Sequence, residues 1–350
     1  MGPAPERPID ERKWMGAFMH RSADQSRMDR GVLLPDTDAV DATALGERAA
    51  GLGYDAVWAP ELWGADAFVR LTDLAHRTED VRLGTAIVNV YSRSPAAIAQ
   101  ASATLQEVSG GRFTLGLGVS TPKAIEDLHG LEFERPARRA HETIDLVQQF
   151  TAGEGRVEYD GELVSVADFP ALGTKMPIYY AALGPANRRV VGRLADGWIP
   201  HNVPFDRLEN AFEVVSEAAR EAGRDPEEIE IAPYVPCAVS EDPEKARDAI
   251  RGHVAYYVGS GDGYRRAVGA AFPEADAVAE AWREGDRGEA AARVTDEMVD
   301  ALGIAGTPEG ARQKLAALEA ETPIDHAIVV VPAQAAGELA DSTVEALAPE

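Results

Sequence analysis

Short apolar runs rich in β-branched residues alternate along the chain with amphipathic stretches that carry alanine, glutamate and arginine. This alternation is typical of repeated strand and helix units in which neighbouring strands run parallel. Eight of the apolar runs have the length and composition of strands. The predicted strands are Gly31–Pro35, Ala56–Pro60, Arg82–Asn89, Phe113–Val119, Ile178–Leu183, Gly197–Asn202, Ile229–Val239 and Ala327–Val331.

Several amphipathic stretches between these strands carry the residues that begin or end a helix. Ser94 and Thr307 are each followed by proline, which is a common arrangement at a helix start. Gly53 and Gly223 can adopt the left-handed conformation that ends a helix. The helices predicted from these signals are Asp38–Leu52, Ser94–Val108, Phe205–Ala222 and Pro308–Leu318.

Eight strands joined by helices can form an open sheet or a closed barrel. The count of eight favours closure, and so does the lack of a glycine-rich dinucleotide loop after the first strand. We therefore predict an α/β fold of the (β/α)8 or TIM-barrel type. It would form one domain over residues 30–350, preceded by a flexible arm over residues 1–29.

Two segments interrupt the alternation of strands and helices. The segment Arg156–Val166 alternates apolar and polar residues and contains Asp160-Gly161, which predicts a β-hairpin. The stretch from about residue 259 to 306 is helical and acidic in character. It lies between the seventh and eighth strands, so we expect an insertion near the C-terminal face of the barrel.

The charge balance excludes some partners. The formal net charge is −25, and only 5 of the 34 basic residues are lysine, which leaves 29 arginines. A basic nucleic-acid-binding face is therefore not expected. An acidic, lysine-poor surface of this kind resembles proteins of salt-loving archaea. No apolar run reaches the roughly 20 residues that cross a bilayer, and the charged start is not a secretory signal. We expect a cytoplasmic protein without a membrane partner.

Candidate chemistry is expected where the strands end, because the C-terminal strand ends build the site in such barrels. After the fifth strand, Gly184-Pro185 opens a helix whose first N–H groups suit an anion, with Arg188 or Arg189 beside it. Metal ligation is not predicted, because Cys237 is the only cysteine and no histidine pair has metal-ligand spacing. Familiar hydrolase and nucleotide motifs are also missing, so a bound cofactor is expected to carry the chemistry.

Three segments resemble the luciferase-like superfamily. The longest is Ile87–Ser120, with Asn89, a Tyr-x-Arg-x-Pro run, Ser-Gly-Gly-Arg and Gly-x-Gly. Gly53–Glu61 matches the second strand of that superfamily, and Leu183–Ile199 is similar to its phosphate loop and following helix. Within the superfamily, the chain most resembles the coenzyme F420-dependent 5,10-methylenetetrahydromethanopterin reductases.

The resemblance implies a luciferase-like (β/α)8 barrel, assembled as a homodimer or homotetramer, with coenzyme F420 at the barrel mouth. FMN is the alternative cofactor. It also implies a non-proline cis bond in the third strand, for which Ala86-Ile87 is the matching bond. The residues implied in cofactor binding are Gly184, Pro185, Ala186 and Asn187 at the phosphate, Thr85, Ala86, Ile87 and Asn89 along the ring, and His201 as a hydrogen-bonding partner.

The implied reaction is hydride transfer to the methylene carbon of a reduced pterin carrier of one-carbon units, based on either methanopterin or folate. The chain departs from the family at two acids, because Val32 and Ser120-Thr121 stand where the reductases carry carboxylates. The candidate proton donors are therefore Glu61, Glu126 and Asp127.

Three alternatives stay open at this point. The chain could be an FMN-dependent monooxygenase of the same superfamily. It could be another F420-dependent dehydrogenase that acts on an alcohol or a sugar phosphate. It could also be a catalytically silent flavin-binding protein, which the two missing acids would allow.

Overall fold

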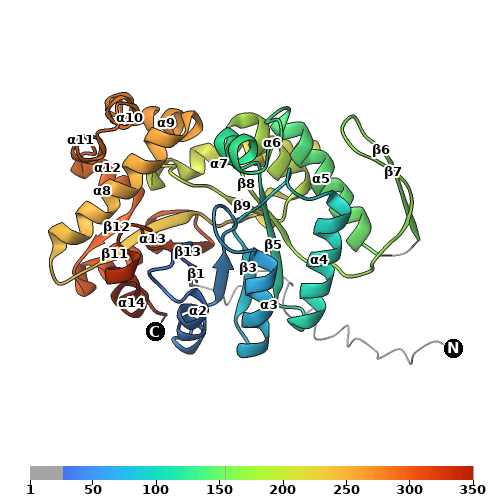
Figure 1. Ribbon diagram of the computed structural model, residues 1–350, viewed down its shortest axis with the longest axis horizontal. Coiled ribbons are helices and arrows are strands. Elements are labelled where there is room, and N and C mark those ends of the chain that lie inside the picture. The colour runs from blue at the N-terminus through green and yellow to red at the C-terminus, as the bar shows by residue number, and fades with distance from the viewer. Residues whose placement is uncertain (1–26, 154, 350) are drawn as a thin grey trace.

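The computed structural model describes residues 27–153 and 155–349 (Figure 1). The predicted N-terminal arm lies outside the described residues up to residue 26. Its last residue, Asp29, already opens the first strand, β1 (Asp29–Leu33). The division of the chain into an arm and one domain therefore stays a prediction.

The central sheet closes into a barrel. Every strand pair around the ring is parallel, and β1 pairs with both β2 and β13, which come early and late in the chain. The predicted (β/α)8 fold is confirmed. In the described part of the chain, the strands of the ring are β1, β2 (Ala56–Ala59), β3 (Arg82–Thr85), β5 (Phe113–Gly118), β8 (Ile178–Ala181), β9 (Gly197–Ile199), β10 (Glu230–Ile231) with β11 (Tyr234–Val239), and β13 (His326–Val330).

The seventh predicted strand is two short strands that complete the ring between them. β10 pairs with β9 on one side, and β11 pairs with β13 on the other. The link between them keeps its hydrogen bonds, because the Ala232 N–H donates to the Trp198 carbonyl at 2.8 Å. On the other side, the Pro233 carbonyl accepts from the Ile328 N–H at 3.0 Å.

The third predicted strand is also divided. β3 ends at Thr85, and the two-residue strand β4 (Val88–Asn89) pairs with β5 further along. The peptide bond between Ala86 and Ile87, which separates the two strands, is cis, as the family resemblance implied. The bulge places these two residues outside the regular ladder at the C-terminal end of the third strand.

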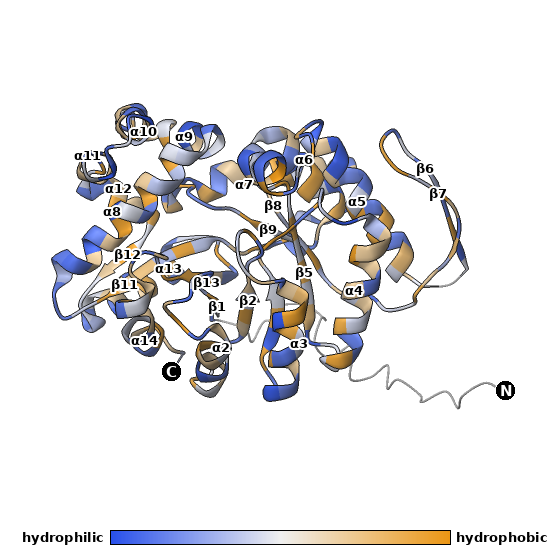
Figure 2. Ribbon diagram, in the orientation of Figure 1, coloured by the Kyte–Doolittle hydropathy of each residue, from blue (hydrophilic) through white to orange (hydrophobic). Residues whose placement is uncertain are grey.

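The barrel helices begin with the expected caps. Ser94 and Thr307 each accept a backbone N–H three residues on, from Ala97 and Gly310. The first predicted helix starts later than expected, because Asp41 and not Asp38 provides the cap. The helices around the barrel are α2 (Ala42–Gly51), α3 (Ala67–Arg77), α4 (Pro95–Val108), α5 (Pro136–Thr151), α6 (Pro185–Leu194), α7 (Leu208–Glu221), α13 (Pro308–Glu321) and α14 (Ala336–Ala346). Hydrophilic and hydrophobic residues lie on different sides of helices such as α3 and α4 (Figure 2).

The segment between β11 and β13 contains a group of helices that pack on their own apolar cluster. They lie beside the barrel at the upper left of Figure 1. A short strand that the sequence did not predict, β12 (Ile304–Gly306), follows them and extends the sheet beside β11. The helices are α8 (Pro243–Ser260), α9 (Asp262–Gly269), α10 (Ala275–Arg283), α11 (Arg287–Ala292) and α12 (Asp296–Leu302).

The predicted hairpin is confirmed as β6 (Arg156–Asp160) and β7 (Ser165–Pro170), which pair antiparallel. It projects beyond α5 at the right of Figure 1. β7 runs four residues further than the sequence pattern indicated. Separately, none of the helices in the described ranges combines the length and the apolar character needed to cross a membrane.

Candidate active site

The bulge in the third strand is held from both sides. The Ala86 N–H donates to the Ala59 carbonyl at 2.8 Å, and the Tyr234 hydroxyl donates to the Ala86 carbonyl. Tyr234 opens β11, so its side chain joins the seventh strand to the third. Ile87 is partly buried against the cluster of side chains that fills the barrel interior. Ala86 and Ile87 therefore form a rigid ledge at the mouth end of the barrel.

Thr85, beside this ledge, connects β3 to β5 by hydrogen bonds. Its hydroxyl both accepts from the Gly116 N–H and donates to the Gly116 carbonyl, at 2.8 Å each. A Cβ atom at Gly116 would lie 1.9 Å from the Thr85 carbonyl oxygen, so this close approach of β3 and β5 requires glycine. Because both hydrogen bonds of the Thr85 hydroxyl are made to β5, only the backbone and the methyl group of Thr85 can contact a ring bound at the mouth.

Asn89 also holds the backbone in place. Its Oδ1 accepts from the N–H groups of Tyr91 at 2.9 Å and Ser92 at 2.8 Å. Its Nδ2 lies 3.3 Å from Nε2 of His129, which follows the fourth strand. The Asn89 side chain therefore shapes the turn from β4 toward α4 and joins it to the loop after β5.

The first turn of α6 is open to solvent. Gly184 is the N-cap residue and Pro185 follows it. None of the side chains in residues 27–153 and 155–349 caps the turn, and the turn itself contains no acidic residue. Gly184, Pro185 and Ala186 are exposed, and no atom lies within 4 Å of a Cβ built on Gly184. Asn187 is partly buried, and its Oδ1 accepts from the Tyr180 hydroxyl at 2.9 Å. The free N–H groups of such a turn form an anion site.

The two arginines of this turn differ in their surroundings. The Arg188 guanidinium lies 5.4 Å from the centre of the Trp198 ring and donates to the Ala211 carbonyl at 3.4 Å. Burial lowers the pKa of Arg188 from its ordinary value. Arg189 is exposed. The packing of Arg188 against Trp198 and α7 leaves Arg189 as the freer of the two cations.

Glu61 lines a pocket of about 430 Å³ formed by the ends of the second, third and fourth strand loops. Both Glu61 carboxylate oxygens accept from Arg93, and Oε2 also accepts from the Ala67 N–H at 3.1 Å. Arg93 also forms an ion pair with Asp66 at 2.6 Å. The hydrogen bond from Arg93 to Glu61 is the main reason that the pKa of Arg93 is raised. The pocket residues are Glu61, Leu62, Trp63, Gly64, Ala65, Asp66, Ser92, Arg93, Leu128 and His129.

The other two candidate acids lie apart from this pocket lining. Glu126 and Asp127 belong to a short π-helix, Ala124–Leu128, and both are exposed. Asp127 forms an ion pair with Lys123 at 2.6 Å. Of the three carboxylates proposed from the sequence, the structure thus brings only Glu61 to the pocket wall.

The two positions where the family carries acids are also resolved. Val32 is fully buried in the core cluster packed between the strands and the outer helices. Side chains alternate along a strand, so its neighbour Leu33 packs with the residues of the barrel interior. Leu33 therefore holds the inward position on β1, and the comparison of Val32 with a family acid stays a prediction. Ser120 has a left-handed backbone with φ of 59° just after β5.

His201 lies in a cluster of buried rings that sequence reasoning missed. Its Nε2 is 3.2 Å from Nε2 of His253, and its ring centre lies 4.2 Å from that of Tyr257 and 4.8 Å from that of Tyr234. Tyr264 on α9 completes the cluster. The run of tyrosines and histidine in 253–264 was the available signal, but the sequence pattern does not show which strand end the insertion covers.

Burial controls the charge of this cluster. It lowers the pKa of His201 far below the ordinary value, with His253 adding to the effect. It lowers the pKa of His253 to about 3. Both rings are therefore neutral near pH 7, and one Nε2 donates its proton to the other. Among the described residues, no group of three or more histidine, cysteine, aspartate and glutamate side chains is placed to hold a metal ion.

Comparisons with known proteins support a family assignment. The chain is 34% identical to a 5,10-methylenetetrahydromethanopterin reductase of Methanolobus tindarius, over 75% of this chain and 82% of that protein. It is 31% identical to a putative coenzyme F420-dependent oxidoreductase of Mycobacterium tuberculosis, over 82% of this chain and 88% of that protein. The structure matches that of the coenzyme F420-dependent tetrahydromethanopterin reductase of Methanopyrus kandleri with a TM-score of 0.78 and 28% identity, over 93% of this chain and 98% of that one.

The family model of luciferase-like monooxygenases matches residues 18–326. That range spans the strand ring up to the start of β13 and therefore includes the bulge, the α6 turn and the cluster around His201. With this match and these relatives, the chain belongs to the luciferase-like monooxygenase family.

Proposed function

We propose that this protein is a coenzyme F420-dependent oxidoreductase that transfers hydride to the methylene carbon of a reduced pterin one-carbon carrier. The carrier would be 5,10-methylenetetrahydromethanopterin or its folate counterpart. The observation that carries the proposal is the placement of the open α6 turn and the Ala86–Ile87 ledge at the C-terminal end of one barrel. Identity of about a third to F420-dependent reductases over most of the chain supports it.

The residues present fit such a cofactor. Gly184, Pro185, Ala186 and Asn187 would hold its phosphate through the exposed first turn of α6, which none of the described side chains caps. Ala86 and Ile87 would lie along its ring, on the ledge that Tyr234 fixes. When bound, F420 supplies the hydride.

The remaining residues hold the ledge in position and exclude water from the mouth of the barrel. Thr85 holds β3 against β5, and Asn89 shapes the adjoining turn, so the ledge is rigid on both sides. The buried, neutral rings of His201 and His253, with the half-buried Tyr257 ring beside them, fill space at the end of the sixth strand and exclude water there. A fixed ledge and a dry mouth favour close approach of two reacting carbons.

A proton must also reach the nitrogen that leaves the methylene bridge. Glu61 is the candidate donor in the pocket wall, and it must first loosen from the Arg93 guanidinium to act as an acid. We predict that Glu61→Gln lowers kcat by about 10²-fold or more while KM changes little. The measurement is a comparison of kcat and KM between the parent and the variant under the same conditions.

Glu126→Gln and Asp127→Asn serve as comparison variants for this prediction. Both carboxylates are exposed, and Asp127 is paired with Lys123, so we expect kcat within about twofold of the parent. A large loss in either variant, with Glu61→Gln fully active, would move the proton donor to the π-helix.

The proposal is tested by binding followed by turnover. Purified protein in high salt is titrated separately with F420 and with FMN, using the change in cofactor fluorescence. Reduced F420 is then mixed with methylene-tetrahydromethanopterin or methylene-tetrahydrofolate, and its oxidation is followed. We expect F420 binding and oxidation by one carrier; oxidation by neither carrier defeats the reductase proposal.

A matched pair of variants tests the phosphate turn. Ala186→Asp places a negative charge in the first turn of α6, whereas Ala186→Asn has nearly the same shape without the charge. We expect Ala186→Asp to weaken F420 binding by about tenfold or more and Ala186→Asn to have little effect. Equal affinities in the two variants would place the phosphate elsewhere.

A second candidate is an F420-dependent oxidoreductase with another acceptor. The similarity to the putative F420-dependent oxidoreductase of Mycobacterium tuberculosis favours it, and so does the presence of Val32 and Ser120-Thr121 where the sequence comparison expected acids. F420 binding without oxidation by either carrier would support this alternative. The dimer or tetramer implied by the family resemblance stays a prediction.

A further inference from the structure

Asn202 follows His201 at the end of the sixth barrel strand and is only 3% exposed. Its backbone is left-handed, with φ of 54°, a conformation that asparagine tolerates better than most residues. Neither Oδ1 nor Nδ2 of this side chain has a hydrogen-bond partner among the residues that the structure describes. A buried amide with both ends unpaired is unfavourable, because water can no longer satisfy it.

The residues that precede Asn202 in the chain lie beside the proposed site. The His201 ring packs edge-on against the Tyr234 ring with centres 4.8 Å apart. The Pro200 carbonyl accepts from the Tyr234 N–H at 2.9 Å, and the Tyr234 hydroxyl donates to the Ala86 carbonyl of the ledge. The two residues that precede Asn202 in the chain thus contact Tyr234, and Tyr234 contacts the ledge along which a cofactor ring would lie.

An unpaired amide at a site offers a defined chemical complement. Its Nδ2 donates and its Oδ1 accepts, so it matches a ligand edge that carries a C=O beside an N–H. Cyclic amides, or lactams, have this edge. Both the deazaflavin ring of F420 and the pterin head of the proposed carrier contain one.

We infer that Asn202 is a ligand-binding residue that reads a lactam edge of the cofactor or of the pterin substrate. The inference rests on the proposed function, because both ligands come from it. A site with a buried polar group of this kind discriminates strongly against analogues that leave it unpaired. Asn202 would therefore contribute to specificity as well as to affinity.

The test uses Asn202→Gly in the full-length protein. Glycine removes the amide and accepts the left-handed backbone without strain, so the variant should fold. Ser102→Ala is the matched control, because the Ser102 hydroxyl is also buried without a partner in the described chain but lies within α4. Dissociation constants for F420, by fluorescence, and for pterin, by calorimetry, are measured for each protein.

We expect Asn202→Gly to weaken the binding of one of the two ligands by about tenfold or more. The dissociation constants of Ser102→Ala should stay within about twofold of those of the parent. Loss of F420 affinity would mean that Asn202 binds the cofactor ring. Loss of pterin affinity would mean that it binds the pterin head of the substrate. If Asn202→Gly folds poorly by thermal unfolding, Asn202→Asp retains the shape and replaces the donor, and is compared in the same way.

Two outcomes overturn the inference and are distinguishable. If the parent binds F420 or pterin and the Asn202 variants bind it equally well, Asn202 is only a turn residue and the proposed function stands. If the parent binds F420, FMN and pterin not at all, both the proposed function and the role of Asn202 fail together.

Discussion

Single buried side chains join parts of this molecule that are distant in sequence, and Glu142 is a clear example. This residue on α5 is fully buried, and its carboxylate accepts from three N–H groups in the turn of the β6–β7 hairpin, at 2.8 to 3.1 Å. Burial alone would raise the pKa of Glu142, but these hydrogen bonds and Arg138 lower it. The turn glycine, Gly161, has no room for a Cβ, which would lie 2.5 Å from Glu142 Oε2.

We predict that Glu142→Gln destabilises the protein by about 1–3 kcal/mol, because the new amide group would point a donor at backbone donors. Urea denaturation with fluorescence detection measures this. Glu162→Gln is the control, since that carboxylate is half-exposed and its loss should cost much less than the loss of the Glu142 carboxylate. An unchanged midpoint in Glu142→Gln would mean that the hairpin is not coupled to the fold.

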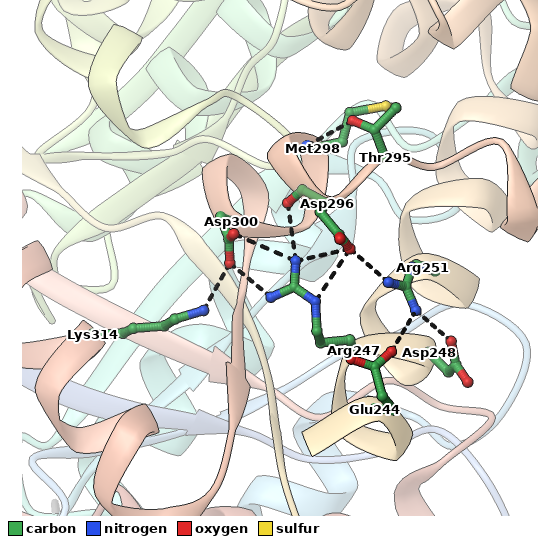
Figure 3. A network of polar contacts seen from close by, with 9 residues as sticks. All are labelled: Glu244, Arg247, Asp248, Arg251, Thr295, Asp296, Met298, Asp300 and Lys314. Carbon is green, nitrogen blue, oxygen red and sulfur yellow. Dashed lines mark hydrogen bonds and ion pairs between the residues drawn. The ribbon is translucent and has the colours of Figure 1, made fainter. Parts of the chain in front are cut away.

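At the scale of whole elements, ion pairs connect helix α12 to its neighbours α8 and α13. Arg247 on α8 pairs with Asp296 and Asp300 on α12, each at 3.0 Å (Figure 3). Lys314 on α13 adds a second cation to Asp300 at 2.7 Å. The Arg247 side chain is largely buried, whereas the two carboxylates are exposed, so solvent screens part of the network.

We predict that Arg247→Gln loosens α12 without unfolding the barrel. Amide hydrogen exchange in Asp296–Leu302 should accelerate several-fold at low salt, and the difference should shrink as salt screens the pairs. Arg293→Gln is the control, because it removes an exposed pair within one helix. Equal exchange in parent and variant would show that apolar packing alone holds α12.

Three buried histidines make the stability of the whole molecule depend on pH. His201 and His253 share the mouth cluster, while His326 lies in the barrel interior with Trp58 Nε1 at 3.0 Å from its Nε2. Burial is the main cause that lowers the pKa of each. Below the ordinary histidine pKa of about 6.5, the unfolded chain therefore binds protons that the folded chain does not.

We predict that the free energy of unfolding falls as the pH is lowered from about 6.5, by up to about 1.4 kcal/mol per pH unit for each buried histidine. His253→Phe should reduce this slope by one proton, measured by urea denaturation between about pH 5 and 7. Asp29 and Asp196, whose pKa values are raised by burial, act in the opposite sense, so the comparison of variants isolates His253.

The charge of the entire chain gives a second prediction at this scale. With a net charge of −25, the folded state carries strong mutual repulsion that dissolved salt screens. We expect Tm to rise substantially between about 0.1 M and 2 M KCl, and to a similar extent in NaCl, because screening does not depend on the cation. A Tm that is flat or falls with salt would contradict this account.

Much of the architecture could be predicted from the sequence. The strands, the caps at Ser94 and Thr307 and the hairpin turn follow from local patterns, because each depends on neighbours within a few residues. The misses have a common cause. The division of the seventh strand and the added strand β12 are set by how separate strands align, which no local pattern encodes.

The sequence by itself determined the barrel, its open α6 turn and the residues near the mouth, because periodicity and turn chemistry act over short distances. Only the tertiary structure decided which of those residues meet. Tyr234 reaches Ala86 across 148 positions of chain, and His201 reaches His253 across 52. It also left the Asn202 side chain buried without a hydrogen-bond partner in the described part of the chain, and it put Glu126 and Asp127 in solvent. These contacts and burials form only when the ring of strands closes, because closure brings distant residues together and removes some of their side chains from water.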